Sequence, residues 1–87
     1  MKPRTAIREF LRNLLDRKGD IQPFSDEVPL LLSGRLQSVD AVELAVFLED
    51  NFDVDFAAIG LDQERIDTVN DILSLIEEYS KAQTGDR

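Results

Sequence analysis

The chain has 87 residues, a formal net charge of −8, and neither cysteine nor histidine. A chain of this length forms one domain, and the absence of Cys and His removes disulfides, thiolate metal sites and the usual base for a serine nucleophile. We therefore expect a single domain over residues 1–87 that is not an enzyme, has no catalytic residues and no metal site, and does not bind nucleic acid.

The charge is unevenly distributed along the chain. Residues 1–18 carry six basic and two acidic side chains, whereas residues 19–87 carry four basic and sixteen acidic ones. An acidic surface of this kind steers a protein toward partners with basic patches. Charged residues also interrupt every apolar run, so we expect no membrane span and no secretory leader, and we expect a cytoplasmic monomer.

Residues 5–18 place apolar side chains at the spacing of one helical face, which predicts a first helix. These apolar residues are Ile7, Phe10, Leu11, Leu14 and Leu15. The opposite face is basic, and we interpret it as solvated. Its residues are Arg4, Arg8, Arg12 and Arg17.

Residues 19–37 predict a long loop. Gly19 and Asp20 have the chemistry of a helix C-cap, and Pro23, Pro29 and Gly34 break any regular element that follows. The loop also holds too much apolar surface to leave in water, so we expect it to pack across the helices. These apolar residues are Ile21, Phe24, Val28, Leu30, Leu31, Leu32 and Leu36.

A second helix is predicted from Ser38 to Phe52, with Ser38 as its N-cap. Its inward stripe is expected to contain Val39, Val42, Ala45 and Val46, widened by Leu44, Phe47 and Leu48. A short helix is predicted after residue 55, on Phe56, Ile59 and Leu61, stopped by Gly60.

A last helix is expected to be capped by Asp67 or Thr68 and to be followed by a frayed tail over residues 81–87. Its inner face comprises Val69, Ile72, Leu73, Ile76 and Tyr79. Together these elements predict an all-α fold: a four-helix bundle with three long helices and one short, a long loop between the first two helices, and a core over about residues 4–80.

The acidic residues between positions 40 and 55 could be metal ligands, acid or base catalysts, or ordinary surface. Residues 50–55 lack the ligand spacing of an EF-hand, so we interpret them as an exposed acidic cluster. Asp40 and Glu43 lie three residues apart on one helical face, and Glu49 and Asp50 follow. This pattern predicts an acidic, solvated surface beside the Ser38 end of the helix, which is either plain solvated surface or a docking face for basic partners.

Ser38 at the start of a helix has two possible roles, as a helix cap or as the attachment site of a phosphate group. A serine at a helix N-terminus caps a free backbone N–H group, a contact worth about 1 kcal/mol. The same free N–H groups and the positive end of the helix dipole favour a phosphate, including one esterified to the hydroxyl. The position of Ser38 is compatible with both roles.

The stretch "LLLSGRLQSVDAVELAVFLEDNFDVDF", followed by "DTVNDILSLIEEY", resembles the acyl carrier proteins and the related peptidyl carrier domains. The resemblance covers about residues 30–80. It implies a four-helix bundle with 4′-phosphopantetheine, donated by coenzyme A, on a serine at the start of the second helix. Ser38 falls on that serine, and Gln37 stands where the family usually has Asp.

The resemblance further implies a stand-alone carrier in fatty acid or secondary-metabolite biosynthesis, which holds an acyl or aminoacyl group as a thioester. The implied partners are a phosphopantetheinyl transferase and loading and acyl-transfer enzymes with basic docking patches. The expected contact residues are Gln37, Val39, Asp40, Val42 and Glu43.

Two alternatives remain open in the sequence. Some apolar residues could line a space for an acyl chain or could be ordinary core: Val42, Val46, Phe56, Ile59 and Ile66. The whole chain could also be a non-carrier acidic helical adaptor of the same fold, in which Ser38 is only a cap and the acidic face binds a basic partner protein.

Overall fold

The computed structural model describes residues 2–79, and these form an all-helical structure without a strand. The α-helices are α1 (Pro3–Arg17), α2 (Ser38–Phe52), α3 (Phe56–Ile59) and α4 (Val69–Tyr79), with one 3₁₀ helix, η1 (Gln63–Arg65). The predicted all-α class is confirmed, and the four α-helices are compatible with a bundle. The tail predicted over residues 81–87 lies outside the described residues.

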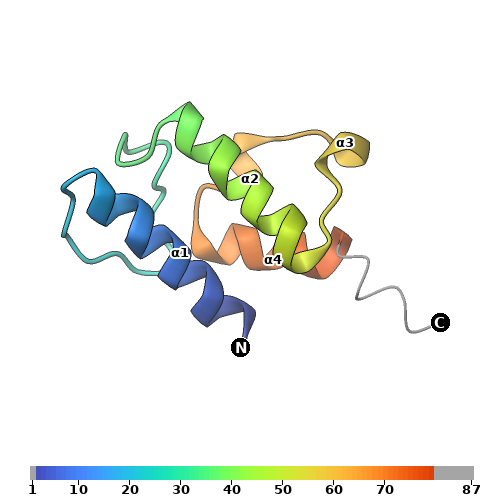
Figure 1. The fold of residues 1–87 in the computed structure, drawn as a ribbon, viewed down its shortest axis with the longest axis horizontal. Helices are drawn as coiled ribbons and strands as arrows, with labels where there is room; N and C mark the ends of the chain where they lie inside the picture. The colour runs from blue at the N-terminus through green and yellow to red at the C-terminus, as the bar shows by residue number, and fades with distance from the viewer. Residues whose placement is uncertain (1, 80–87) are drawn as a thin grey trace.

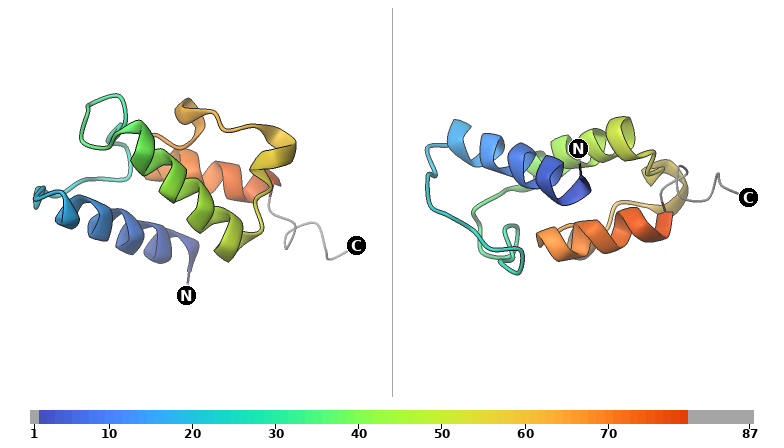
Figure 2. Two further views of the ribbon diagram at one scale, coloured as in Figure 1. Left: turned by 45° about the horizontal axis from the view of Figure 1, so that its top comes forward. Right: turned by 90° about the horizontal axis from the view of Figure 1, so that it is seen from below.

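The three long helices surround one core. Figure 1 and Figure 2 show α1 and α2 side by side and running in opposite directions, with α4 on the other side of the core. The chain between α2 and α4, which includes α3 and η1, runs along one edge of this arrangement (Figure 1). The largest fully buried side chains come from all three long helices and the segments between them: Ile7, Leu11, Leu14, Leu15, Leu30, Leu44, Leu48, Val54, Ile66, Val69, Ile72 and Leu75.

The predicted inward face of α2 is confirmed in part, because Leu44, Ala45 and Leu48 are buried as expected. The residues that enter the core are Ala41, Leu44, Ala45 and Leu48. Val39, Val42 and Val46 are instead exposed, with exposed fractions of 64%, 54% and 49%. Both stripes have helical spacing, so periodicity alone does not separate them; burial of the larger leucines removes more apolar area from water than burial of the valines does.

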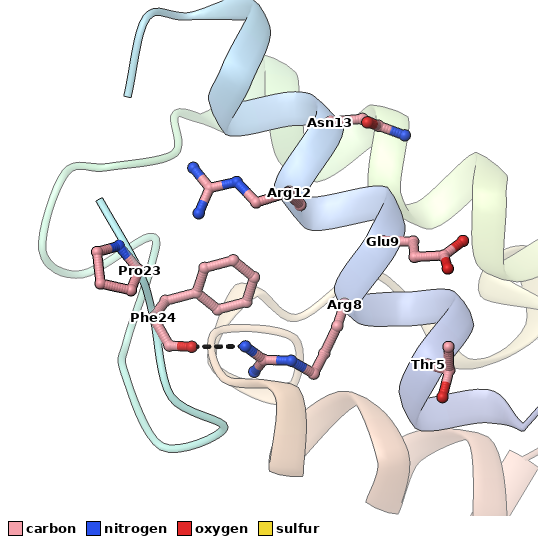
Figure 3. A pocket seen from close by; sticks show the side chains of 7 residues that line it. All are labelled: Thr5, Arg8, Glu9, Arg12, Asn13, Pro23 and Phe24. Carbon is pink, nitrogen blue, oxygen red and sulfur yellow. Dashed lines mark hydrogen bonds between the residues drawn. The ribbon is translucent and has the colours of Figure 1, made fainter. Parts of the chain in front are cut away.

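The basic face of α1 is not simply solvated as predicted, because three of its arginines hold residues 20–26 against the helix. Arg8 donates to the carbonyl of Phe24 at 2.7 Å (Figure 3) and to Asp26 at 2.6 Å. Arg12 donates to the carbonyl of Gln22 at 2.8 Å, and Arg4 forms an ion pair with Asp26. The cations therefore satisfy carbonyl groups of a segment that has no helix or strand of its own.

Residues 20–26 are also held by Arg35, which lies near the end of the connection between α1 and α2. Arg35 donates to Asp20 at 2.8 Å and to the carbonyls of Gln22 and Pro23. The hydrogen bonds from Arg35 lower the pKa of the Asp20 carboxyl below its ordinary value. The start and the end of the α1–α2 connection are thus tied to each other as well as to α1.

The apolar side chains of residues 19–37 differ in burial. Phe24, Leu30 and Leu36 are buried as predicted, and Val28 and Leu31 are partly buried against the core. Ile21 and Leu32 are exposed. Those two side chains depart from the expectation that this segment packs its apolar surface against the helices. The burial that does occur is enough to join the segment to the common core.

The start of α4 also fixes part of the α1–α2 connection. Thr68 caps α4 as predicted, accepting a hydrogen bond from the backbone N–H of Asp71 at 2.9 Å. The carboxylate of Asp67 accepts from the backbone N–H groups of Leu31 and Leu32 at 2.5 and 3.2 Å. One pair of adjacent residues therefore both begins a helix and holds a distant turn.

The short helix predicted after residue 55 is confirmed as α3, although Leu61, which was expected to belong to it, lies beyond its end at Ile59. Gly60 caps this end, and its φ of 81° lies in the region that favours glycine. Among the residues that the structure describes, no helix is long and apolar enough to cross a membrane.

The burial of α2 predicts unequal effects of two truncations. Leu44→Ala should lower the free energy of unfolding by about 2–5 kcal/mol, because it leaves a cavity in the core. Val42→Ala, two residues away on the exposed stripe, should lower it by about 0.5 kcal/mol. Urea denaturation followed by circular dichroism measures both, and equal losses would contradict the assignment of the inward face.

Candidate functional site

Ser38 is the first residue of α2, and its side chain is exposed. The predicted N-cap role is wrong: Gln37, with φ −110° and ψ 175°, is the N-cap residue. The hydroxyl is one position further along than a capping group, where the helical turn points it outward. The backbone N–H groups of a first turn have no acceptor within their own helix. The Ser38 hydroxyl therefore lies beside the positive end of the α2 dipole.

A glutamine from another element contacts the Ser38 hydroxyl. Gln63 Nε2 in η1 donates a hydrogen bond to Ser38 Oγ at 3.3 Å. Within residues 2–79 this is the one side-chain hydrogen bond recorded for Ser38. Both side chains are exposed, so the contact leaves the hydroxyl open to solvent. Sequence reasoning missed Gln63, because a separation of 25 residues gives no local signal for the contact.

Asp40 fixes the start of α2 from inside. Its carboxylate accepts from the backbone N–H of Gln37 at 2.8 Å and from Lys18 Nζ at 2.9 Å. The residue is only 6% exposed, so the prediction that it belongs to a solvated acidic surface is wrong. Polar groups at this depth need partners, and Lys18 at the end of α1 supplies a charged one.

The charge state of Asp40 follows from these contacts. Burial by itself raises the pKa of the Asp40 carboxyl, but the hydrogen bonds from Gln37 and Lys18 and the nearby cationic charges outweigh it. The pKa is consequently lower than the ordinary value for Asp, and the group is ionised at neutral pH. The ion pair joins the end of α1 to the start of α2, two residues after Ser38.

The other predicted contact residues lie on the outer side of α2. Val39 and Val42 are exposed, and Glu43 is exposed and pairs with Arg17 at 3.1 Å. Gln37 is exposed beside Ser38. Of the five residues predicted to contact partners, four are thus available at the surface, and Asp40 is the one that turns inward.

The residues expected to line an acyl-chain space do not form one set. Phe56 and Ile66 are buried, whereas Val42, Val46 and Ile59 are exposed. A hollow of about 100 Å³ includes two of the five. Its lining residues are Phe56, Ile59, Gly60, Asp62, Arg65, Leu75 and Tyr79. The valines of α2 were misplaced for the same reason as in the core, namely that α2 has two apolar stripes.

A wide hollow of about 640 Å³ beside α1 contains none of the predicted site residues. Figure 3 shows Arg8 and Arg12 reaching from α1 toward Phe24, with their guanidinium carbons 4.5 and 5.5 Å from the ring centroid. Both guanidinium groups already donate to loop carbonyls and carboxylates. The hollow is therefore a by-product of how the loop is held, since its cations are occupied.

Comparison of the chain with models of protein families, with curated proteins and with solved structures finds no match. Over residues 2–79 the structure also has no group of three or more acidic side chains placed to hold a metal ion. The site is therefore described by its own geometry, an outward hydroxyl at the first turn of α2.

The buried carboxylate generates a pH-dependent prediction. Asp40→Asn should lower the free energy of unfolding at pH 7 by about 1.5–3 kcal/mol, because it removes a charged hydrogen bond with Lys18. The folded pKa of Asp40 is depressed, so its contribution is fully present above the unfolded value of about 3.9 and is lost as the pH falls through the lower folded value.

Chemical denaturation of parent and variant between neutral and acid pH measures this difference. Asp50→Asn is the matched control, because Asp50 is exposed on the same helix, and its effect should stay within about 0.5 kcal/mol. A variant at Asp40 that is as stable as the parent at pH 7, or a difference that persists in acid, would be incompatible with the role given to this ion pair.

Proposed function

We propose that this protein is a stand-alone carrier whose Ser38 receives 4′-phosphopantetheine from coenzyme A. The observation that carries the proposal is the exposed Ser38 hydroxyl on the first turn of α2, in a segment that resembles the carrier family. A carrier requires a reachable hydroxyl on a fixed backbone, and it requires no catalytic base of its own, because the modifying enzyme supplies the chemistry.

The attachment step is a phosphoryl transfer to the serine. The Ser38 oxygen forms a bond to the phosphorus that bears the pantetheine arm, the pyrophosphate bond of coenzyme A breaks, and adenosine 3′,5′-bisphosphate leaves. The hydroxyl proton passes to a base of the transferase. When bound, the arm supplies a thiol that carries the cargo as a thioester.

The residues around Ser38 fit such a group. The N–H groups of the first turn, which have no acceptor within their own helix, and the dipole at the start of α2 favour a phosphodiester charge there. Gln63, whose amide already donates to the Ser38 oxygen, can donate to the same oxygen or to the phosphodiester after modification. Asp40 and Lys18 keep the first turn in place from the buried side.

The outer side of α2 supplies a contact surface for partner enzymes. Val39 and Val42 offer apolar area next to Ser38, and Glu43 offers a carboxylate. With a net charge of −8, the protein would be steered toward enzymes with basic docking patches. The alternative is the acidic helical adaptor, in which the same surface binds one basic partner and Ser38 stays unmodified.

Intact-mass spectrometry separates the two functions. After incubation with coenzyme A and a broad-specificity phosphopantetheinyl transferase, the parent protein should gain the mass of one phosphopantetheine. Ser38→Ala should gain nothing and should fold as the parent does, because within residues 2–79 the exposed hydroxyl has a hydrogen bond to Gln63 alone. Ser74→Ala, which removes an exposed serine from α4, is the matched control and should be modified fully. If the parent protein stays unmodified while a known carrier in the same tube is converted, the carrier function is contradicted and the adaptor function is favoured.

Gln37 provides a further prediction about the modification rate. Carrier-family members usually have Asp at this position, and Gln37 is exposed and directly precedes Ser38. Gln37→Asp should therefore be modified faster than the parent by the same transferase, at unchanged fold, because it adds a carboxylate that the basic enzyme surface attracts. Initial rates from timed mass spectra test this, with Gln22→Glu as a control that makes the same change of charge at an exposed residue outside the site. An unchanged rate for Gln37→Asp would show that an acidic residue before Ser38 does not speed the modification of this protein.

A further inference from the structure

An aromatic stack lies at the surface between α1 and α2, away from Ser38 along the helix. The rings of Phe10 and Phe47 are stacked with centroids 4.2 Å apart and planes inclined by 17°. Phe52 meets Phe47 edge to face at a centroid distance of 6.0 Å. Phe10 and Phe47 are only partly buried, so a stack that would ordinarily belong to a core keeps apolar area in contact with water.

The stack lies between two neighbouring hollows that share three lining residues. The hollows have volumes of about 380 and 390 Å³, and both are lined by Phe10, Phe47 and Asn51. The first is completed by Ala6, Glu9, Asn13 and Phe52, and the second by Val42, Glu43, Val46 and Asp50. We call these two hollows and the stack between them the aromatic groove.

One wall of the aromatic groove is an exposed aliphatic stripe. Val42 and Val46 line it with about half of their surface exposed, and Val39 extends the stripe one turn toward the start of α2. From Val39 to Val46 the stripe is about 10 Å long, since a helix rises about 1.5 Å per residue. Apolar side chains spaced along a partner helix match a stripe and groove of this shape.

The rim of the aromatic groove is acidic. Its charged lining residues are Glu9, Glu43 and Asp50, and within residues 2–79 no Lys or Arg lines either hollow. Of these three carboxylates, only that of Glu43 has an ion-pair partner in the same range of residues, namely Arg17 at 3.1 Å. An apolar floor with unneutralised carboxylates beside it is complementary to a ligand with an apolar face and flanking cations.

We propose that the aromatic groove docks an amphipathic helix of a partner protein, which places aliphatic side chains on Phe10 and Phe47 and Lys or Arg beside the rim carboxylates. A second copy of this chain fits less well, because a symmetric pairing would bring the same carboxylates together. The aromatic groove shares its valine stripe and Glu43 with the contact surface of the proposed carrier, and it extends that surface across the seam to Phe10 of α1. The docking itself requires neither Ser38 nor its modification.

A designed peptide tests the groove directly. The probe is a fluorescein-labelled helical peptide of about 18 residues, five turns, with Leu and Ala on one face and Lys flanking that face. Two control peptides carry Glu in place of each Lys, or the same residues in an order that breaks the apolar face. Fluorescence anisotropy with the full chain should show binding of the Lys-flanked peptide and neither control, and amide shifts in two-dimensional NMR should cluster at Phe10, Val42, Val46 and Phe47.

Variants with matched controls locate the site. Val46→Glu should weaken binding about tenfold, whereas Leu32→Glu, at an exposed leucine outside the groove, should leave it unchanged. Asp50→Lys should weaken it similarly, with Glu27→Lys as the control for net charge. Ser38→Ala should bind as the parent does, so a failed modification of Ser38 and a failed docking are distinguished. Circular dichroism checks the fold of each variant.

Several results would overturn the proposal. Binding that is equally tight for the Glu-flanked or reordered peptide, or equally reduced by Glu27→Lys and Asp50→Lys, would show a non-specific charge effect. Absence of binding would show that the groove takes no such helix. A dimer in sedimentation that Val46→Glu dissociates would assign the groove to a second copy instead.

Discussion

The buried carboxylate of Asp40 is the constraint on which the rest of the site depends. It accepts hydrogen bonds from the N–H that precedes α2 and from the ammonium group at the end of α1. The first contact fixes where α2 begins, and the second fixes where this point lies relative to α1. Ser38 therefore sits on a turn that Asp40 holds from the buried side, and its own hydroxyl is exposed.

The positions of the arginine side chains explain why carboxylates remain exposed on α2 although the first helix is basic. Arg8, Arg12 and Arg35 are turned toward residues 20–26, where they satisfy carbonyls and the carboxylates of Asp20 and Asp26. Those cations are not available to neutralise the carboxylates along α2. The outer side of α2 consequently combines exposed valines with the carboxylates of Glu43, which pairs with Arg17, and Asp50, and both the carrier proposal and the aromatic groove use this chemistry.

The long helices could be predicted from the sequence because each has the apolar period of a helix. The Thr68 cap and the stop at Gly60 rest on local chemistry and are found in the structure, and α2 begins at Ser38 as predicted although its N-cap is Gln37. On α4, Tyr79 was expected on the inner face but is exposed, and Leu75 is buried instead. The inward face of α2 could be predicted only in part, because its two apolar stripes have the same spacing and only the packing of α1 and α4 chooses between them.

The contacts that build the candidate site could not be predicted from the sequence, because they too depend on how distant segments pack. Asp40 with Lys18 and Ser38 with Gln63 are separated by 22 and 25 residues, and nothing in the local pattern marks them as partners. An acidic residue on a helix near other acidic residues is usually solvated, and for this reason the sequence predicts Asp40 at the surface. The sequence likewise predicts that the arginines of α1 lie in solvent, because a charged helical face is usually exposed.

Peptide mapping after co-expression with a phosphopantetheinyl transferase tests the central claim most directly. Trypsin cleaves after Arg35 and Arg65, and the peptide 36–65 contains Ser38 as its only hydroxyl-bearing side chain. The account predicts that this peptide carries phosphopantetheine and loses the arm as a fragment in tandem mass spectrometry. Recovery of the peptide only in its unmodified form, from cells in which a known carrier is converted, would contradict it.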